Sequence, residues 1–436
     1  MIFEEITIEK LAHGGDGLGH LADGRVIFVE GAIPGDVVDV EVVKDKKSWA
    51  RGKIKAIRKP SQERVAPGCD GFERGCGGCQ FWEMNFDREL EWKAQAAFEA
   101  MERIGGLELV EPVLVEAPSM RDYRSCVTLH QRRQKGRLTR GFYAAASRRV
   151  VPIEGCPIAR PEIDEAMAEL EGALDLVGKA DIGMETTGDG GVVVHIELLP
   201  KERIRKKHLE ELARRVEQGG VVRGIEVMDE KGDHYVIGDS TVEVHEVLAR
   251  PPVAAMRVES GRFRQVNRAV NDQLVDHVVK VVAQNWERPR IVELYCGAGN
   301  FSFPLIELAD RFRGYEKSRG AVETARQMAA LSHTEEDVAF EVVDLSDKEG
   351  VALVLEQPFE VLLVDPPRKG APLVVERLVE EERQGQLIYV SCDPACLARD
   401  AKVLARGGWT METLHFFDMF PRTAHLEAVA VFERIG

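Results

Sequence analysis

The stretch RIVELYCGAGNF, residues 290–301, decides the fold of the C-terminal part of the chain. A strand-forming run leads into a turn with Gly297 and Gly299, where the missing side chains let a ligand approach the backbone closely. The turn lacks the third glycine of a dinucleotide fingerprint, so it does not identify its ligand alone. Glu316 ends the next strand, 21 residues after Tyr295, where a carboxylate commonly holds both ribose hydroxyls. Together these features predict an adenosine ligand, either a dinucleotide or S-adenosylmethionine.

Strands and helices alternate on both sides of this turn. Apolar periodicity predicts helices over 268–285, 302–309, 319–331, 373–382 and 396–406, with strand-forming runs between them and a last strand, LEAVAVFE, at 426–433. This alternation indicates an α/β fold with a doubly wound, mainly parallel, Rossmann-like sheet. Ligands of such sheets bind beyond the carboxyl ends of the strands, which is where the unusual motifs lie.

The N-terminal part of the sequence has a different character. Residues 1–60 contain short valine-rich strands separated by Gly and Pro-Gly, which predicts a small β-barrel. A helix over 86–106 and mixed strands and helices over 112–260 follow. We therefore predict three domains: an OB-like barrel at 1–60, a central α+β domain at 61–262 and the α/β domain at 263–436.

Composition and charge limit the function classes. The chain of 436 residues has a net charge of −16, which argues weakly against a nucleic-acid partner. Two basic segments instead suit a phosphate-binding surface. Residues 44–59 contain eight Lys or Arg and one acidic residue, and residues 121–149 contain nine Lys or Arg and one Asp. No apolar run is long enough for a membrane span, and no secretory signal is visible. Eight cysteines in this setting predict reduced thiols and a cytoplasmic location.

The motif LLVDPPRKG, residues 362–370, places Asp365 at the end of a buried strand. Two prolines make the following loop rigid and remove its amide donors. Asp-Pro-Pro at such a strand end is typical of methyltransferases that act on planar nitrogenous substrates. Arg368 and Lys369 suit a phosphate backbone, whereas the alternative is a merely rigid turn.

The last strand, within TAHLEAVAVFE at 423–433, has two apolar faces, so we expect it to be central in the sheet. Glu427 opens this strand. Burial there would raise its pKa toward that of a useful general base. His425 is the alternative base.

The motif YVSCDP, residues 389–394, ends a strand with Cys392. A cysteine in this position is either a small buried hydrophobe or a thiol presented for chemistry. Its position alone does not separate these alternatives.

A second cysteine motif, CDGFERGCGGC at residues 69–79, brings three thiols close together. A fourth ligand is needed, and Cys156 in GCP is the best candidate because Cys-Pro is typical of the last ligand of ferredoxin-type clusters. Zinc ribbons usually supply two Cys-x2-Cys pairs, and only one is present. We therefore favour a [4Fe-4S] cluster over zinc and expect Cys126, Cys296 and Cys396 to be packing residues.

Taken together, the motifs resemble those of the RNA 5-methyluridine methyltransferases, specifically the iron–sulfur branch that acts on bacterial ribosomal RNA. The resemblance runs nearly end to end, in the order GGDGLGHLADGRVIFVEGAIPGDVV, CGGCQ, DYR, GFY, FRQVN, ELYCGAGNF, GYEKS, DPPRKG, SCDPACLARD and HLEAV. It implies a TRAM-type barrel, a central domain with an iron–sulfur site and RNA contacts, and a C-terminal methyltransferase sheet. It also implies RNA, with 23S ribosomal RNA favoured, as the partner, and we expect a monomer with no membrane contact.

The resemblance assigns roles residue by residue. It makes Cys392 the nucleophile and Glu427 the base. The residues that correspond to the S-adenosylmethionine site are Gln265, Tyr295, Asn300, Glu316, Asp344 and Asp365, of which Asp344 stands where relatives often have Asn. The residues that match the four cluster ligands are Cys69, Cys76, Cys79 and Cys156.

This assignment explains why a strand would end by presenting a thiol. Carbon 5 of uracil is too weak a nucleophile to take a methyl group directly. A thiolate that adds at carbon 6 makes carbon 5 electron-rich, and the target base must leave its stack to reach the site. The alternatives are a transfer-RNA uridine-5 or RNA cytosine-5 methyltransferase, and a non-catalytic RNA-binding iron–sulfur protein.

Overall fold

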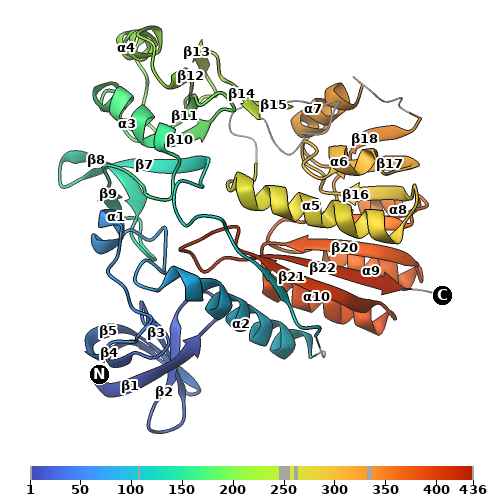
Figure 1. The fold of residues 1–436 in the computed structure, drawn as a ribbon. Helices are drawn as coiled ribbons and strands as arrows, with labels where there is room; N and C mark the ends of the chain where they lie inside the picture. The colour runs from blue at the N-terminus through green and yellow to red at the C-terminus, as the bar shows by residue number, and fades with distance from the viewer. Residues whose placement is uncertain (1, 107–108, 245–255, 260–263, 331–335, 435–436) are drawn as a thin grey trace. The chain divides into compact units, whose positions relative to one another are not determined.

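The computed structural model describes residues 2–106, 109–244, 256–259, 264–330 and 336–434 (Figure 1). The chain divides into two units. The first unit comprises Met1–Gly68, Cys79–Ala117 and Asp344–Gly436, and the second comprises Cys69–Gly78 and Pro118–Val343. The predicted boundaries at 60/61 and 262/263 stay predictions.

The N-terminal strands of the first unit close into a barrel, as predicted. Its strands are β1 (Ile2–Leu11), β2 (Gly17–His20), β3 (Val26–Glu30), β4 (Val37–Asp45) and β5 (Trp49–Lys59), in the order β1-β2-β3-β5-β4. Alternate residues such as Ile8, Ile27 and Val38 fill its interior. A Cβ at Gly52 would lie 2.3 Å from Cγ1 of Val40 and 2.8 Å from the carbonyl oxygen of Glu41, so only glycine allows this close approach of β4 and β5.

The rest of the first unit combines α2 with the last strands and helices. The helices are α2 (Phe86–Gly105), α8 (Lys348–Leu355), α9 (Pro372–Glu380) and α10 (Pro394–Arg406). The strands are β6 (Val113–Val115), β19 (Val361–Val364), β20 (Gly385–Ser391), β21 (Thr410–Phe417) and β22 (Glu427–Arg434), in the sheet order β19-β20-β22-β21-β6. Helix α2 packs against α10. Strand β22 lies between β20 and β21, which confirms its predicted central position.

The second unit contains a seven-stranded sheet. Its order is β13-β12-β11-β10-β7-β8-β9, formed by β7 (Cys126–Gln134), β8 (Arg137–Tyr143), β9 (Val150–Pro152), β10 (Ala180–Thr186), β11 (Val192–Leu198), β12 (Val222–Met228) and β13 (His234–Gly238). Helices α3 (Pro161–Leu174) and α4 (Lys206–Glu217) cover one face of this sheet and form an apolar core with it (Figure 1). The short helix α1 (Asp70–Glu73) lies in the cysteine-rich segment, and β14 (Thr241–Val244) pairs with β15 (Met256–Glu259).

The second unit also contains the strands around the glycine turn. Parallel strands lie in the order β18-β17-β16, formed by β16 (Arg290–Leu294), β17 (Arg311–Glu316) and β18 (Val338–Val342), with helices α5 (Arg268–Asn285), α6 (Ser302–Ile306) and α7 (Arg319–Ala329). Asn267 caps α5 by accepting a hydrogen bond from the Val270 amide at 3.4 Å.

Most predicted helices are confirmed, with small differences at their ends. Helix α5 has the predicted bounds 268–285, and α2 ends at a left-handed Gly106 as its glycine pair suggested. Helix α10 begins at Pro394, earlier than predicted, because Asp393 caps it and proline fits the first helical position. The sequence reading missed α8 and β21. Among the described residues, no helix combines the length and hydropathy that a membrane crossing requires.

Candidate active site

The thiol of Cys392 lies in a tight turn between β20 and α10. The Oγ of Ser391 accepts a hydrogen bond from the amide of Asp393 at 3.2 Å and donates to its carbonyl oxygen at 3.0 Å. The carboxylate of Asp393 then accepts from the amides of Ala395 and Cys396, which caps α10. These contacts fix the backbone on both sides of Cys392, so its thiol has a defined place at the end of the strand.

The surroundings of Cys392 hold its thiol in the protonated form. Burial and the nearby Glu427 raise the pKa of the Cys392 thiol to about 11, while Arg368 opposes this rise. The thiolate is the reactive form of cysteine. The thiol must therefore lose its proton before it can act as a nucleophile.

Two carboxyl groups lie in the same cluster. Glu427 begins the central strand β22 and is only 3% exposed. Burial, together with the charge of Asp365, raises the pKa of Glu427 well above its ordinary value. Burial also raises the pKa of Asp365 to about 7. The expected rise of the Glu427 pKa is thus confirmed, and the two carboxyls disfavour each other's ionisation.

The alternative base, His425, is in a different environment. It is exposed, and its ring makes an edge-on contact with Phe420 at a centroid distance of 6.0 Å. His425 lines a pocket that also contains Cys392. Of the two alternatives, only Glu427 is buried, as the sequence-based argument for a base required.

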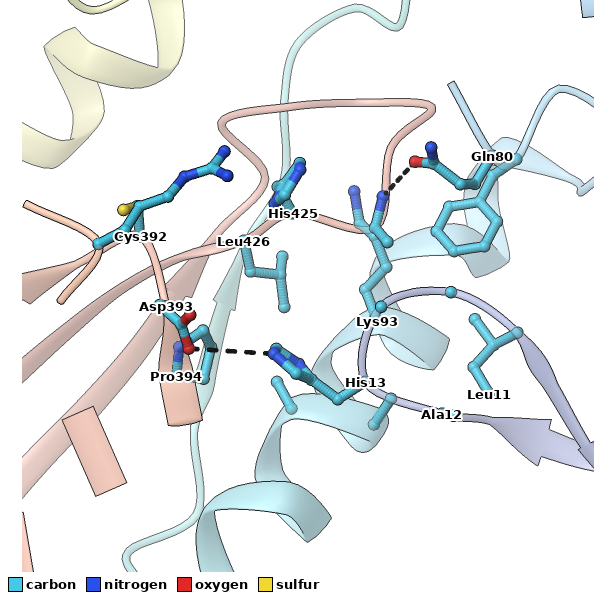
Figure 2. Close-up of a pocket in the computed structure, with 17 residues that line it drawn as sticks. Leu11, Ala12, His13, Gln80, Lys93, Cys392, Asp393, Pro394, His425 and Leu426 are labelled. Carbon is cyan, nitrogen blue, oxygen red and sulfur yellow. Dashed lines mark hydrogen bonds and ion pairs between the residues drawn. The ribbon is translucent and has the colours of Figure 1, made fainter. Parts of the chain in front are cut away.

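The pocket beside Cys392 has a volume of about 160 Å³ (Figure 2). The barrel loop after β1, helix α2, the turn around Cys392 and the segment before β22 all contribute to it. Its lining residues are Leu11, Ala12, His13, Gly14, Gly15, Gln80, Phe81, Lys93, Ala96, Ala97, Arg368, Cys392, Asp393, Pro394, Ala424, His425 and Leu426. Figure 2 shows His13 directed toward Asp393, with Nε2 4.0 Å from Oδ1. The barrel therefore forms part of the wall of the pocket that contains Cys392.

A buried ionic network fixes the segment that leads to Glu427. The Nζ of Lys93 lies 2.5 Å from Oδ1 of Asp418 and 3.0 Å from Oε1 of Glu89. Arg422 donates to Glu89 and to the carbonyl oxygens of Phe81 and Met84. The four charged side chains are at most 4% exposed. Loss of one partner would leave an uncompensated buried charge, so the network holds this segment firmly against α2.

The glycine turn in the second unit has the geometry of a ligand-binding loop. Tyr295, Gly297 and Gly299 have φ angles of +62°, +56° and +108°, which lie in the left-handed region. A Cβ built on Gly297 would have no neighbour within 4 Å, so the backbone there is open to a ligand. The residues present thus fit the adenosine group that the sequence predicted.

Glu316 lies beside this turn, as the sequence predicted. Its carboxylate accepts hydrogen bonds from the amides of Ser318 at 2.7 Å and Gly297 at 3.4 Å. Asn300 exchanges two hydrogen bonds with Asn271 of α5, at 2.9 and 3.0 Å. Asn271 was missed by sequence reasoning, since a buried asparagine within a helix carries no local signal. Hydrogen bonds thus fix Asn300 to α5, and Glu316 of β17 to the turn at Gly297.

The other predicted cofactor residues are more dispersed. Gln265 is 9% exposed and lies just before α5 in the second unit. Asp344 belongs to the first unit, where its carboxylate accepts from the amide and hydroxyl of Ser346. Asp365 lies with Cys392 and Glu427 in the first unit. A shared cofactor site for all six residues stays a prediction.

Three of the four predicted cluster cysteines lie near one another in the second unit. A Cβ on Gly71 would lie 3.6 Å from Sγ of Cys69 and 3.7 Å from Cβ of Cys76. Burial raises the pKa of Cys156 to about 11, and the charge of Cys69 adds to this rise, whereas the amides of Ile158 and Ala159 oppose it by hydrogen bonding.

The fourth predicted ligand, Cys79, is the first residue of the next segment of the first unit. Within the described ranges, no three His, Cys, Asp or Glu side chains are arranged to hold a metal ion. The thiols and the amide donors beside them still have the chemistry of a thiolate-bound cluster.

Comparison with known families gives two matches. Residues 239–435 match the family model of tRNA (uracil-5-)-methyltransferases, and residues 4–55 match that of the TRAM domain. The second match coincides with the barrel formed by β1–β5.

Comparison with individual proteins extends over nearly the whole chain. A 23S rRNA (uracil(1939)-C(5))-methyltransferase of Methylococcus capsulatus is 33% identical over 98% of this chain and 96% of its own length. A protein of the same name from Vibrio parahaemolyticus is 30% identical, over 99% of this chain and 96% of its own length. The crystal structure of the Pyrococcus abyssi tRNA (uracil-54, C5)-methyltransferase with S-adenosyl-L-homocysteine aligns with a TM-score of 0.73 at 24% identity, covering 99% and 100% of the two chains. The last comparison shows a common fold.

Proposed function

The chain belongs to the RNA uracil-C5 methyltransferase family, and we propose that it methylates carbon 5 of a uridine in 23S ribosomal RNA. The observation that carries this proposal is the cluster of Cys392, Glu427 and Asp365 at the ends of neighbouring strands. S-adenosylmethionine, when bound, supplies an electrophilic methyl group. The chain's own residues must then activate the uracil and remove a proton from it.

Cys392 provides the activation. Its sulfur forms a bond to carbon 6 of the uracil, and the electrons of the 5,6 double bond move toward carbon 5 and the carbonyl oxygen. Because the pKa of the Cys392 thiol is about 11, a neighbouring group must accept the thiol proton. Asp365, whose pKa is about 7, is ionised in part of the molecules at neutral pH and suits this task.

Glu427 completes the reaction as the general base. After carbon 5 has gained the methyl group, it still carries a hydrogen. Glu427 removes this proton, the 5,6 double bond forms again, and the bond between Cys392 and carbon 6 breaks. Burial raises the pKa of Glu427, which makes its carboxylate a stronger base. The buried ionic network of Glu89, Lys93, Asp418 and Arg422 supports this role because it fixes the segment before β22.

The residues proposed to hold S-adenosylmethionine are Gln265, Tyr295, Asn300, Glu316, Asp344 and Asp365. The open backbone at Gly297 and the position of Glu316 beside it support an adenosine site in the second unit. The carboxylate of Glu316 would receive hydrogen bonds from the ribose hydroxyls.

Ribosomal RNA is the favoured substrate because the named relatives at 30% and 33% identity act on 23S rRNA and match nearly the whole chain. A transfer-RNA uridine is the second candidate, since the Pyrococcus abyssi enzyme of the same fold acts on tRNA. RNA modification together with reduced thiols supports the cytoplasmic location, and the monomeric state stays a prediction.

We also propose that Cys69, Cys76, Cys79 and Cys156 hold a [4Fe-4S] cluster with a structural role, because the transfer of a methyl group needs no electron. Amide donors at Gly78, Ile158 and Ala159 support this assignment, since hydrogen bonds to sulfur stabilise thiolate ligands. Iron and sulfide analysis of anaerobically purified protein should give about four of each per chain, and Cys76→Ser should abolish the visible absorption. One zinc and no iron would refute the cluster.

Methylation of 23S rRNA from cells that lack this protein tests the main proposal. The purified chain should introduce 5-methyluridine at one site, mapped by mass spectrometry of RNase fragments. Unmodified transfer RNA is the matched second substrate. Methylation of transfer RNA alone would show that transfer RNA, and not 23S rRNA, is the substrate. Methylation of a cytidine would show that the reaction is not uracil-C5 methylation.

A further inference from the structure

We propose that His130 and Tyr143, held by Arg132 and Asp181, form a stacking platform for an unpaired base of the RNA substrate. This inference rests on the proposed function, because it takes RNA to be the substrate. It concerns the seven-stranded sheet of the second unit, which lies between the two family-model matches at 4–55 and 239–435.

Strand β7 presents two different faces. Leu129 and Gln131 are fully buried on the face that packs against α3 and α4. Because side chains alternate along a strand, His130 and Arg132 lie on the opposite face. Asp181 of β10 pairs with His130 in the register, so it lies on that same face. The side chains of His130, Arg132 and Asp181 retain 22%, 19% and 29% exposure. This face therefore offers polar and aromatic groups to a partner.

The two rings are already stacked on each other. The centroids of His130 and Tyr143 are 3.8 Å apart, and their planes differ by 15°. Arg132 donates to the Tyr143 hydroxyl at 2.7 Å and to Oδ1 of Asp181 at 2.5 Å. Nδ1 of His130 lies 2.6 Å from the same carboxylate oxygen. The rings and the guanidinium are thus fixed in place before any ligand arrives, which lowers the entropic cost of binding.

Asp181 serves to hold this platform together. Burial raises the pKa of Asp181, but hydrogen bonds from His130 and Arg132 outweigh this effect and bring its pKa below the ordinary value. The carboxylate is therefore ionised at neutral pH, and its charge is matched by Arg132. A phosphate close to the platform meets little net repulsion.

The charge around the platform favours RNA over an acidic or neutral partner. Residues 121–149, which contain β7 and β8, hold nine Lys or Arg and one Asp in a chain whose net charge is −16. Lys135, Arg137, Arg148 and Arg149 are exposed. Unpaired RNA is recognised by bases stacked on aromatic rings or guanidinium planes, together with basic groups that meet the phosphates. The cluster supplies both features within one hairpin region.

Binding of a fluorescein-labelled 20-nucleotide oligouridylate to the full-length protein, measured by anisotropy, tests the platform. Tyr143→Ala should raise Kd about tenfold, because base stacking on one aromatic ring contributes roughly that factor. Tyr143→Phe keeps the ring and should restore most of the affinity. The matched control is Tyr235→Ala, which makes the same change on β13 at the other edge of the sheet and should leave Kd within twofold.

A salt titration separates stacking from charge. Arg137→Gln, at one of the exposed basic residues, should reduce the slope of log K against log salt by about 0.7, the value for one phosphate contact on a single strand, whereas Tyr143→Ala should leave the slope unchanged. Melting temperatures close to that of the wild type show that the variants fold. If the melting temperature of Tyr143→Ala is well below that of the wild type, His130→Ala is used in the comparison instead of Tyr143→Ala.

The outcomes distinguish this inference from the proposed function. If the wild type methylates 23S rRNA but both ring variants bind oligouridylate as the wild type does, the platform is refuted and the function stands. If the wild type neither binds nor methylates RNA, both the proposed function and the stacking platform are refuted. A tenfold loss in Tyr143→Ala and its recovery in Tyr143→Phe would establish the platform.

Discussion

Glu316 and Glu427 both lie at strand ends near the proposed sites, but their surroundings are opposite in kind. Glu316, at the end of β17, accepts hydrogen bonds from two backbone amides, at 2.7 and 3.4 Å. Glu427, at the start of β22, is 3% exposed and lies near Asp365, and its pKa is raised well above the ordinary value. A carboxylate that receives amide hydrogen bonds suits binding, whereas a buried carboxyl beside another acid suits proton transfer.

The difference has a physical consequence for stability. Hydrogen bonds that satisfy a carboxylate add to folding stability, but burial of an ionised carboxyl opposes folding. We infer that the turn at Gly297 is built to hold a ligand, and that the cluster of Cys392, Glu427 and Asp365 keeps an unfavourable arrangement because the chemistry requires it.

The largest effect should follow the loss of the Cys392 thiol, the proposed nucleophile. Cys392→Ala should reduce methylation by about 10⁴-fold or more, because the variant lacks the sulfur that is proposed to bond to carbon 6 of the uracil. Binding of S-adenosylhomocysteine, measured by calorimetry, should persist. Cys396→Ala, in the first turn of α10, is the matched control and should retain activity. Normal methylation by Cys392→Ala would refute the covalent route.

Loss of the Glu316 carboxylate, proposed to bind the cofactor, should have a smaller effect of a different kind. Glu316→Gln should weaken binding of S-adenosylhomocysteine about 10–100-fold, since hydrogen bonds to a charged group contribute roughly 1.5–3 kcal/mol. Calorimetry measures this change. Glu341→Gln, on the neighbouring strand β18, is the control and should bind normally. If Glu316→Gln binds S-adenosylhomocysteine as tightly as the wild type does, Glu316 does not bind the adenosine part of the cofactor.

The protonation of Cys392 gives a test on the free protein. Because the pKa of its thiol is raised to about 11, alkylation by iodoacetamide should rise about tenfold per pH unit from pH 7 to 9.5. Mass spectrometry of the peptide that contains Cys392 measures the rate. A plateau above pH 8 would mean that the thiolate is already formed and that no proton acceptor is needed.

The smallest expected effect is on the free energy of unfolding, which substitution of the two glutamates, Glu316 and Glu427, should change in opposite directions. The folded-state pKa of Glu427 is above its unfolded value, so the folded state holds the proton more tightly and stability falls as pH rises from about 4.5 toward the folded pKa. Glu427→Gln should therefore gain about 1–3 kcal/mol over the wild type at pH 8 and little at pH 4.5, measured by urea denaturation. Glu316→Gln should instead be less stable at pH 8. If Glu427→Gln is less stable than the wild type at pH 8, burial of the ionised Glu427 carboxyl does not destabilise the folded protein.

Local patterns in the sequence predicted where several residues of the proposed site lie in the fold. Cys392 and Glu427 were found because each lies at the end of a strand whose apolar pattern is clear, and helix 268–285 was found with its bounds. The glycine turn and Glu316 were also local signals. Family resemblance supplied the roles of the residues, which spacing alone did not give.

The parts that depend on distant contacts escaped prediction. Lys93 and Asp418 are 325 residues apart, and Arg422 reaches Glu89 across 333 residues, so no local pattern shows that they meet. Asn271 is hidden in the same way within α5. Helix α8 is short and β21 has an irregular pairing, and short or irregular elements have little periodicity to detect.

Trapping of the covalent complex by Glu427→Gln tests the central claim most directly. Glutamine keeps the shape of the side chain but cannot accept the carbon-5 proton, so thiol addition and methyl transfer should proceed and release of Cys392 should stall. The variant should accumulate as a complex with methylated RNA, seen as a slow band on a denaturing gel and absent when Cys392→Ala is added. His425→Asn, run in parallel, should turn over without the band. Normal turnover by Glu427→Gln with a trapped complex in His425→Asn would contradict the account.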